Sequence, residues 1–333
     1  MNILVIRLSS LGDVVLTALL VRRLRDRFPE ALIDFVTLAA NLPLLEAMPE
    51  LDGRFAFGNE QFEEYDVVID LQNNLRSRRR TRQLHAGRII RYHRPRVNRF
   101  FRIHFPGSRK NLETPAPVAR QYLAILKSLG VTDDGSIPKL SPPAEWIASA
   151  ESMLVENGLT TDNLVLIAVG GRHKTKIWPR EKWLALIQQA YDKGFTQFAI
   201  IGSIADVLAA EFIIKSVPYP VITFAGKTDV AQLTGLIASA KLLICGDSGP
   251  MHIAAAVGTS VVAIFGPTVQ EFGFAPLTAN ARVVEVLGLD CRPCHPHGPE
   301  KCPKSHFRCM LEITPDVVLQ NALELTAPPG TRR

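Results

Sequence analysis

The chain has 333 residues, which is long for one compact core and suits two domains of roughly 150 residues each. Its composition, with 47% hydrophobic and 21% charged residues, is that of a folded globular protein and excludes a disordered one. Its apolar runs are shorter than the ~20 residues of a membrane-spanning helix, so we do not expect an integral membrane protein. The first ten residues, MNILVIRLSS, lack the basic start and the cleavage site of a signal peptide, and we expect a cytoplasmic protein.

The net charge of +6 comes from one segment of the chain. Residues 76–110 hold 13 Lys and Arg and no Asp or Glu, whereas the remainder of the chain has more acidic than basic side chains. A local basic patch of this kind predicts an anionic partner, which is a phosphorylated small molecule, an anionic membrane surface or nucleic acid.

Apolar runs typical of buried strands alternate with segments of helical period along most of the chain. In the first half we expect strands at 2–7, 32–36 and 66–71 and a helix at 14–28. In the second half the expected strands are 164–169, 197–201, 221–224, 242–245 and 260–265. The helices expected between and after these strands are 180–193, 205–215, 230–240, 250–257 and 315–325. Strands that alternate with helices predict parallel sheets with crossover helices, which is the doubly wound α/β architecture.

A proline-rich stretch at 137–144, IPKLSPPA, marks the expected boundary between two Rossmann-like domains. We expect an N-terminal domain at 1–143, a C-terminal domain at 144–312, and a final helix and tail at 313–333 that packs back on the N-terminal domain. Two such domains that face each other form a cleft, and ligands bind at the carboxyl ends of the strands. The functional residues are therefore expected in the loops that lead from strands to helices.

The first of these loops, RLSSLGD at 7–13, follows the first expected strand. Its serines and Gly12 suit a tight turn, and Asp13 falls at the start of the next helix. Asp13 either caps this helix or acts as a general base directed into the cleft. No GxGxxG motif occurs here, which argues against a dinucleotide site in the N-terminal half.

A second loop, GGRHKTKIWP at 170–179, follows a strand of the C-terminal half. Glycines, a hydroxyl and lysines before a helix suit phosphate binding through backbone N–H groups and mobile cations. The loop is not a P-loop, because GxxxxGK[ST] is absent. The alternative is an exposed basic turn in which Trp178 serves for packing.

A third loop, CGDSGPMH at 245–252, again joins a strand to a helix. Gly249 permits close approach of the backbone to a ligand, and a helix that begins near Pro250 directs its positive end at an anion. Asp247 is expected to cap the helix or to accept from a ribose hydroxyl, and His252 to contact phosphate or to lie in the core. Two loops of the phosphate-binding type in one half favour a nucleotide ligand.

Five segments in order along the chain carry a resemblance to a known family. They are RLSSLGDVVL at 7–16, YDVVIDLQNNLRS at 65–77, KIWP at 176–179, AGKTDVAQL at 225–233 and GDSGPMHIAAA at 246–256. The chain resembles the bacterial lipopolysaccharide heptosyltransferases, glycosyltransferase family nine with the GT-B fold, and within them the heptosyltransferase II type more than type I.

The resemblance implies an inverting, metal-independent transfer of L-glycero-D-manno-heptose from its ADP derivative to an inner-core glycolipid. It implies that Asp13 deprotonates the acceptor hydroxyl, that Lys176 holds the diphosphate, that Asp206 binds the ribose and that Thr228 lies beside the adenine. The full set of donor-binding residues that it implies is Gly170, Gly171, Arg172, Lys176, Asp206, Thr228, Asp247, Ser248, Gly249, Met251 and His252.

One position departs from the pattern of the family. Type I members have a Thr-Thr pair where this chain has Gly171 and Arg172. The phosphate contacts at this point are therefore expected from backbone N–H groups or from the Arg172 guanidinium.

The acceptor implied by the resemblance is a lipid A–Kdo type glycolipid, which is anionic and lies on the inner face of the cytoplasmic membrane. The expected acceptor-binding residues are Ser9, Ser10, Gly12, Asn73, Asn74, Arg76 and Arg79. Basic residues favour an anionic membrane surface, so the segment 76–110 predicts peripheral association with the inner membrane. Its aromatic residues, Tyr92, Phe100, Phe101 and Phe105, either insert among acyl chains or pack against the domain. RNA is the rival partner, but no RRM, KH or zinc-knuckle motif accompanies the segment, and we expect no nucleic acid.

Four cysteines lie close together near the end of the chain, at Cys291, Cys294, Cys302 and Cys309, with three histidines among them. In a cytoplasmic protein the Cys-x2-Cys spacing predicts a metal, and four soft ligands suit structural zinc. An iron–sulfur cluster and unligated thiols are the alternatives. No cofactor is expected for catalysis.

Two readings of the function other than heptosyl transfer to the inner core stay open on the sequence. One is a member of the same family that uses another sugar donor or acceptor. The other is a non-catalytic protein that binds an anionic glycolipid or RNA. The presence of both Asp13 and Lys176 favours a transferase.

Overall fold

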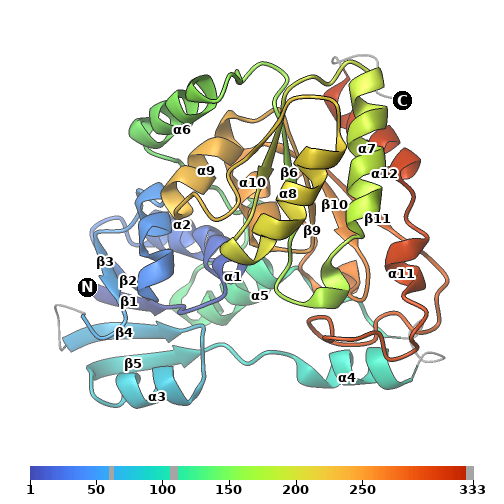
Figure 1. Cartoon of the computed structure of the whole chain (residues 1–333). Coiled ribbons are helices and arrows are strands. Elements are labelled where there is room, and N and C mark those ends of the chain that lie inside the picture. The colour runs from blue at the N-terminus through green and yellow to red at the C-terminus, as the bar shows by residue number, and fades with distance from the viewer. Residues whose placement is uncertain (60–63, 106–111, 328–333) are drawn as a thin grey trace. The chain divides into compact units, whose positions relative to one another are not determined.

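The computed structural model describes residues 1–59, 64–105 and 112–327. These residues form two compact units, each built on its own parallel sheet (Figure 1). The first unit comprises Met1–Pro95 and Ala116–Pro143, and the second comprises Arg96–Pro115 and Ala144–Arg333.

The first unit contains a five-stranded sheet in the order β3-β2-β1-β4-β5, with all neighbours parallel. Its strands are β1 (Asn2–Ile6), β2 (Leu32–Thr37), β3 (Gly53–Ala56), β4 (Glu64–Asp70) and β5 (His85–Arg91). Its helices are α1 (Leu11–Leu16), α2 (Ala18–Arg27), α3 (Leu75–Thr81) and α5 (Val118–Ala124), with 3-10 segments η1 (Ala39–Ala47) and η3 (Ile125–Leu129). Strand β1 is buried from Ile3 onward, which explains why its sequence is an unbroken apolar run.

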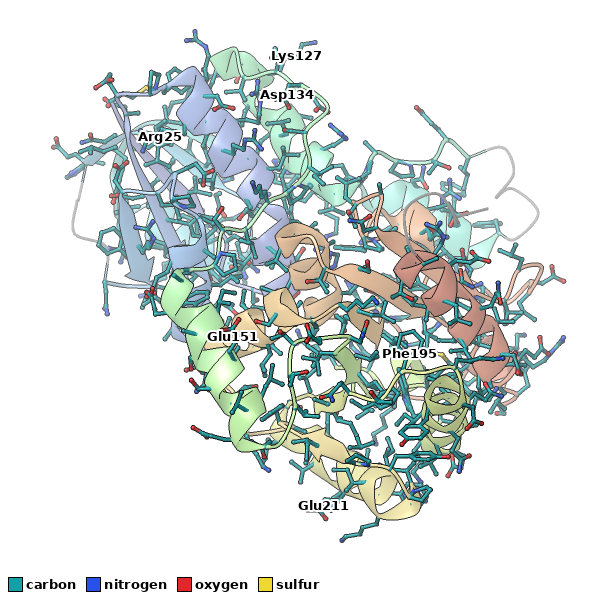
Figure 2. All side chains as sticks on the ribbon, turned by 90° about the horizontal axis from the view of Figure 1, so that it is seen from above. Arg25, Lys127, Asp134, Glu151, Phe195 and Glu211 are labelled. Atoms are coloured by element: carbon teal, nitrogen blue, oxygen red, sulfur yellow. The ribbon has the colours of Figure 1, made fainter. Side chains whose placement is uncertain are left out.

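The register of the first sheet positions the loop that carries Asp13. Ile6 of β1 lies beside Asp70 of β4, so the two strands end at the same level. The loop after β1 and the loop after β4 therefore leave the sheet as neighbours. Ion pairs hold α2 to the rest of this unit, including Arg23 with Asp134 at 3.0 Å (Asp134 is labelled in Figure 2).

The second unit contains a six-stranded sheet in the order β11-β10-β9-β6-β7-β8, again with all neighbours parallel. Its strands are β6 (Val165–Ala168), β7 (Phe198–Ile201), β8 (Val221–Thr223), β9 (Leu242–Gly246), β10 (Ser260–Phe265) and β11 (Ala281–Glu285). Its helices are α4 (Arg96–His104), α6 (Ala144–Glu156), α7 (Arg180–Asp192), α8 (Val207–Ser216), α9 (Val230–Ser239), α10 (Gly249–Val257), α11 (Arg308–Leu311) and α12 (Pro315–Thr326). Short 3-10 turns precede α7 and α8 and follow β10, at η4 (Lys174–Lys176), η5 (Ile204–Asp206) and η6 (Gln270–Phe272).

Close packing in the second unit depends on both large and small residues. Trp178 and Trp183 are buried and meet edge to face, with 4.9 Å between their ring centroids. Gly235 lies where α9 crosses α6, and a Cβ there would fall 2.3 Å from the Trp146 carbonyl oxygen. Only a glycine permits this approach, because the atom that blocks a side chain belongs to the backbone.

The expected doubly wound architecture is confirmed, since both units are parallel α/β sheets. The division of the chain differs from the expectation at two points. The segment Arg96–Pro115 belongs to the second unit, although we assigned all of 1–143 to the first. Helix α12 packs against α7, β9, β10 and β11 and is grouped with the second unit, although we expected a separate final segment at 313–333. In the part of the chain that is described, no helix combines the length and the apolar character needed to cross a membrane.

Candidate active site

Asp13 lies in the first turn of α1, directly after β1, and is 9% exposed. Its Oδ2 atom accepts from Arg7 Nη2 at 2.8 Å, from Ser10 Oγ at 2.9 Å and from the Ser10 backbone N–H at 3.2 Å. Its Oδ1 atom accepts from the Tyr122 hydroxyl at 2.9 Å. Asp13 thus caps α1 through Ser10, as one alternative expected, and it also lies in a buried group of polar side chains that a cap does not require.

The electrostatic surroundings keep Asp13 ionised. Burial opposes the charge, but Arg7, Arg94 and the hydrogen bonds from Tyr122 and Ser10 outweigh it and lower the pKa of Asp13 to about 2. Burial, together with the neighbouring Asp13 charge, raises the pKa of Tyr122 well above its usual value, so Tyr122 stays protonated and donates.

The segment after β4 adjoins the Asp13 loop, as the register of β1 and β4 requires. Gln72 Oε1 accepts from the backbone N–H groups of Leu8 and Ser9, at 3.1 and 3.3 Å. Asn73 is held in the turn, where its Nδ2 donates to the Tyr92 carbonyl at 2.8 Å and its Oδ1 accepts from Arg78 Nε at 2.8 Å.

The other expected acceptor residues lie in α3 or at its start, and in α1. Asn74 caps α3 by accepting from the Ser77 backbone N–H at 3.0 Å. Arg76 and Arg79 of α3 are exposed, whereas Gly12 is buried in α1.

The expected donor-binding residues lie in loops at the carboxyl ends of β6, β7, β8 and β9, as the parallel order of these strands requires. Asp206 contacts the loop after β6, because a Cβ on Gly170 would fall 2.0 Å from Asp206 Oδ1. Its Oδ2 accepts from the backbone N–H and the hydroxyl of Ser203, at 2.7 and 2.8 Å. The loop after β8 adjoins the same turn, since a Cβ on Gly226 would meet Ile204 at 3.1 Å, and Thr228 follows in this loop.

Lys176 makes the central contact among these loops. Its Nζ lies 2.6 Å from Asp247 Oδ2, and the Thr268 hydroxyl donates to the same oxygen at 2.8 Å. The backbones of Gly246 and Lys176 also approach each other, because a Cβ on Gly246 would fall 3.1 Å from the Lys176 carbonyl oxygen. The structure therefore brings 176 and 247 together, and it pairs the lysine with a carboxylate.

Helix α10 begins directly after this pair, with Ser248 as its N-cap residue, Gly249 first and Pro250 second. Met251 and His252 are buried, and the His252 ring faces Phe274 with 6.4 Å between the centroids. Arg172 is exposed.

The model of glycosyltransferase family 9 (heptosyltransferase) matches residues 56–302. The chain belongs to this family. Lipooligosaccharide heptosyltransferase 2 of Haemophilus influenzae is 26% identical to it, over 98% of this chain and 100% of that protein. Lipopolysaccharide heptosyltransferase 3 of Escherichia coli K12 is 28% identical, over 81% of this chain and 83% of that protein. These findings confirm the resemblance that the five sequence segments indicated.

Solved structures show the same fold. The structure of E. coli ADP-heptose LPS heptosyltransferase II superposes with a TM-score of 0.76, at 23% identity, and covers 98% of each chain. That of the family 9 glycosyl transferase from Veillonella parvula gives a TM-score of 0.80 at 22% identity, over 98% of this chain and 97% of that one. The GT-B fold expected for the family is confirmed.

The four late cysteines of this family 9 enzyme lie in a loop between β11 and α11 and in α11 itself. Cys294 and Cys309 interact electrostatically with Cys291, Cys302 and each other, and burial, reinforced by the neighbouring thiols, raises their pKa values to about 11 and about 12. In the three described stretches of the chain, no three His, Cys, Asp or Glu side chains are arranged to hold a metal ion. The thiols are thus neighbours that do not form a ready-made metal site.

The cysteine loop, residues 291–302, packs on the loop that carries Lys176. The Thr175 hydroxyl donates to the Pro299 carbonyl, and a Cβ on Gly298 would fall 3.1 Å from Lys176 Cγ. The cysteine loop is therefore part of the surroundings of the donor lysine.

Three residues of the candidate site were missed by the sequence analysis. Arg7 and Tyr122 bind Asp13, and Thr268 binds Asp247. Thr268 carries a signal in hindsight, because GPT at 266–268 follows an apolar strand as the other site loops do. Tyr122 carries none, since it lies 109 residues from Asp13 in an ordinary helix.

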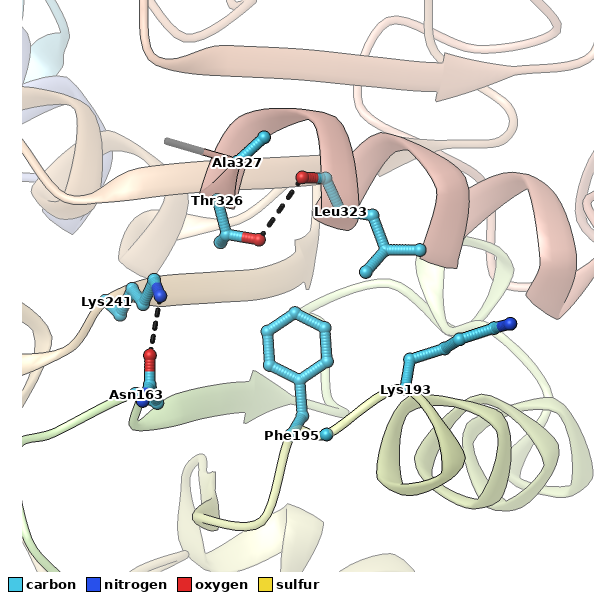
Figure 3. Close-up of a pocket in the computed structure, with 8 residues that line it drawn as sticks. Asn163, Lys193, Phe195, Lys241, Leu323, Thr326 and Ala327 are labelled. Atoms are coloured by element: carbon cyan, nitrogen blue, oxygen red, sulfur yellow. Dashed lines mark hydrogen bonds between the residues drawn. The ribbon is translucent and has the colours of Figure 1, made fainter. Parts of the chain in front are cut away.

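An open pocket of about 340 Å³ lies elsewhere in the second unit (Figure 3). Asn163, Phe195 and Lys241, which line it, precede β6, β7 and β9. The pocket thus lies at the amino ends of the strands, the opposite edge from the site loops. Lys241 Nζ donates to Asn163 Oδ1 at 2.5 Å on one side of the pocket (Figure 3).

Proposed function

We propose that the enzyme transfers heptose, with inversion, from ADP-L-glycero-D-manno-heptose to an inner-core lipopolysaccharide acceptor. Its membership of the heptosyltransferase family supports the reaction class. The observation that carries the proposed mechanism is the ionised Asp13 carboxylate, which is buried and held by Arg7, Ser10 and Tyr122 at the carboxyl end of a parallel sheet.

Asp13 acts in this proposal as the general base toward the acceptor hydroxyl. A carboxylate with a pKa near 2 is a weak base toward a resting sugar hydroxyl. The acidity of that hydroxyl rises steeply as its oxygen bonds the anomeric carbon, so the proton moves late in the step. A low pKa also keeps the carboxylate ionised at neutral pH.

The donor is bound by the second unit. Lys176 and the N-terminus of α10 supply positive charge to the diphosphate, on which about one further negative charge develops as the glycosidic bond breaks. Gly170 and Gly171 allow the backbone to approach, and Arg172 is exposed and able to reach a phosphate.

The acidic residues of the donor site have a different task from the cations. A carboxylate repels phosphate, so Asp247 holds Lys176 in place and does not itself bind the diphosphate. Asp206 Oδ1 faces Gly170 and accepts from a ribose hydroxyl, while its Oδ2 is already bound to Ser203. Thr228 lies beside the adenine.

No divalent cation takes part in the proposed reaction, because Lys176 and the helix N-terminus supply the charge that a metal provides elsewhere. The zinc predicted at the four cysteines has a structural task, and its binding requires the thiols to converge from the arrangement seen here. Dialysis against a chelator that removes free divalent cations but not this zinc should leave turnover unchanged. Metal analysis of the purified protein should find zinc.

The acceptor is a lipid A–Kdo type glycolipid on the inner face of the cytoplasmic membrane, to which the enzyme binds from the cytoplasm. Its negative charge suits the exposed arginines of α3, Arg76 and Arg79. Part of the basic segment, Arg109 and Lys110, lies outside the described residues.

The test measures transfer from ADP-heptose to defined acceptor lipids that already carry zero, one or two heptoses. We expect turnover with one of the three acceptors. In Asp13→Asn we expect kcat to fall by about 10²–10⁴-fold while the ADP affinity, measured by calorimetry, stays unchanged.

Lys176→Met should weaken ADP binding by about 10- to 100-fold, since a hydrogen bond to a charged group is lost. Lys174→Met, an exposed lysine of the same loop, is the matched control and should bind ADP as the wild type does.

Two results would overturn the proposal. Undiminished turnover in Asp13→Asn removes Asp13 from the mechanism. A wild-type enzyme that binds no ADP, or that transfers a different sugar in preference to heptose, removes the proposed donor.

A further inference from the structure

The two oxygens of the Asp13 carboxylate have unequal numbers of partners. Each carboxylate oxygen has two lone pairs in the plane of the group. Oδ2 accepts from three donors, namely two on Ser10 and one on Arg7. Among the residues that the structure describes, Oδ1 accepts from one donor, the Tyr122 hydroxyl at 2.9 Å. Oδ2 is therefore saturated, and Oδ1 keeps one lone pair.

We infer that Asp13 Oδ1 is the atom that receives the acceptor's proton and that Tyr122 is the residue that positions it. The inference rests on the proposed role of Asp13 as the base. In the step, the proton of the acceptor hydroxyl passes to Oδ1 and the acceptor oxygen bonds the anomeric carbon. The bond from that carbon to the donor's phosphate oxygen breaks, and its electron pair leaves with ADP.

Tyr122 is itself held in position by packing against neighbouring side chains. Its side chain is fully buried, and the Tyr92 ring meets it edge to face with 4.8 Å between centroids. The Arg7 guanidinium carbon lies 5.4 Å from the centre of the same ring. Arg7 is anchored in turn through Nη1 to the Leu71 carbonyl at 2.7 Å. The hydroxyl of Tyr122 is thus held at one place, where it fixes the direction of the remaining Oδ1 lone pair.

The charged and titratable groups that face Asp13 are Arg7, Arg94 and Tyr122. Removal of the Tyr122 hydroxyl takes away one hydrogen bond that lowers the pKa of Asp13, so the pKa rises. Arg7 and Arg94 remain, and Asp13 stays ionised at neutral pH. The variant therefore loses orientation at neutral pH and loses ionisation earlier as the solution becomes acidic.

The test compares Tyr122→Phe with Tyr92→Phe. Tyr92 offers a matched control, because its hydroxyl bonds Gln121 Oε1 at 2.7 Å and its ring packs in the same cluster. We expect Tyr122→Phe to lower kcat by about 10- to 100-fold, as misplacement of a reacting group does, with KM for the donor unchanged. The acid limb of its pH–kcat profile should move to higher pH. Tyr92→Phe should keep kcat within about twofold and keep the wild-type profile.

The outcomes separate this inference from the proposed function. If Asp13→Asn is inactive but Tyr122→Phe matches Tyr92→Phe in kcat and in pH profile, the positioning role is overturned and the base survives. If Tyr122→Phe loses kcat with no shift of the acid limb, its effect is structural and the inference also fails. If Asp13→Asn is fully active, the proposed function itself fails.

Discussion

At the scale of single residues, the site of the first unit depends on a charge that is costly to bury. Asp13 and Arg7 are both largely buried, so each must be compensated by the other and by neutral donors. The sequence indicates Asp13 from its place after an apolar strand. It does not indicate Arg7 and Tyr122, because a buried ion pair and a hydrogen bond between distant segments leave no periodic pattern.

The low pKa of Asp13 predicts a pH-dependent contribution to stability. The folded-state pKa, about 2, lies below the ordinary value of 3.8 for an aspartate, so the contribution is present above pH 4 and is lost as the pH falls toward 2. At neutral pH it amounts to roughly 2 kcal/mol. We expect urea unfolding to show Asp13→Asn less stable than the wild type at pH 7, with the difference shrinking between pH 4 and 2. A difference that is constant over this range would contradict the prediction.

At the scale of elements, the donor site is built where loops approach each other too closely for ordinary side chains. The strands that carry these loops are predicted well from sequence, since β6 and β7 are short apolar runs, and β9 and β10 are apolar except for Gly246 and Ser260. Strand β5 and helix α4 are not, because both lie in the basic segment and β5 is an edge strand without an apolar run.

Gly170 and Gly171 provide a paired test of this close packing. A Cβ on Gly170 would overlap Asp206, which Ser203 holds through two hydrogen bonds, whereas the nearest atoms to a Cβ on Gly171 lie at 3.6 Å. We expect Gly170→Ala to lower the free energy of unfolding by about 1–3 kcal/mol and to weaken ADP binding. Gly171→Ala should change stability by no more than about 0.5 kcal/mol in the same denaturant titration. Equal effects of the two substitutions on stability would contradict the prediction, because they would show that the Asp206 side chain moves aside at no cost.

At the scale of the whole molecule, the sequence predicts two Rossmann-like units and the position at which α6 begins the main part of the second. It fails for residues 96–115, which belong to the second unit although they are enclosed in the sequence of the first. Arg99 shows the cause, because its Nη2 donates to the Phe272 carbonyl at 3.0 Å and its guanidinium lies over the Phe272 and Phe274 rings. These partners are 173 positions apart in the sequence, and the sequence of a short helix does not reveal so distant a contact.

Of the aromatic residues of the basic segment that the sequence analysis named, one packs inside its unit and three are exposed. Tyr92 is buried beside Tyr122, which is the packing alternative. Phe100, Phe101 and Phe105 are 54%, 39% and 49% exposed and contact one another. An exposed aromatic cluster on a basic segment suits the interface of an anionic membrane.

The membrane proposal predicts a change in vesicle binding. We expect the wild type to co-sediment with phosphatidylglycerol-containing vesicles and to be released by salt, because part of the attraction is electrostatic. Joint replacement of Phe100, Phe101 and Phe105 by Ser should weaken binding at least about tenfold, since three exposed rings no longer insert. Leu208→Ser, at an 80% exposed position of α8, is the control and should bind as the wild type does. Equal binding by both variants would contradict a role for the cluster.

The pairing of Lys176 with Asp247 has a consequence for the last stage of the proposed cycle. Asp247 holds the lysine, so a diphosphate that binds Lys176 competes with this carboxylate for the positive charge. The same attraction acts when the sugar has gone and only ADP remains. As the nucleotide loosens, Asp247 still holds the lysine, and rebinding of the spent product meets the same competition. An ion pair inside the donor site thus weakens the hold on ADP and favours exchange for a fresh sugar nucleotide.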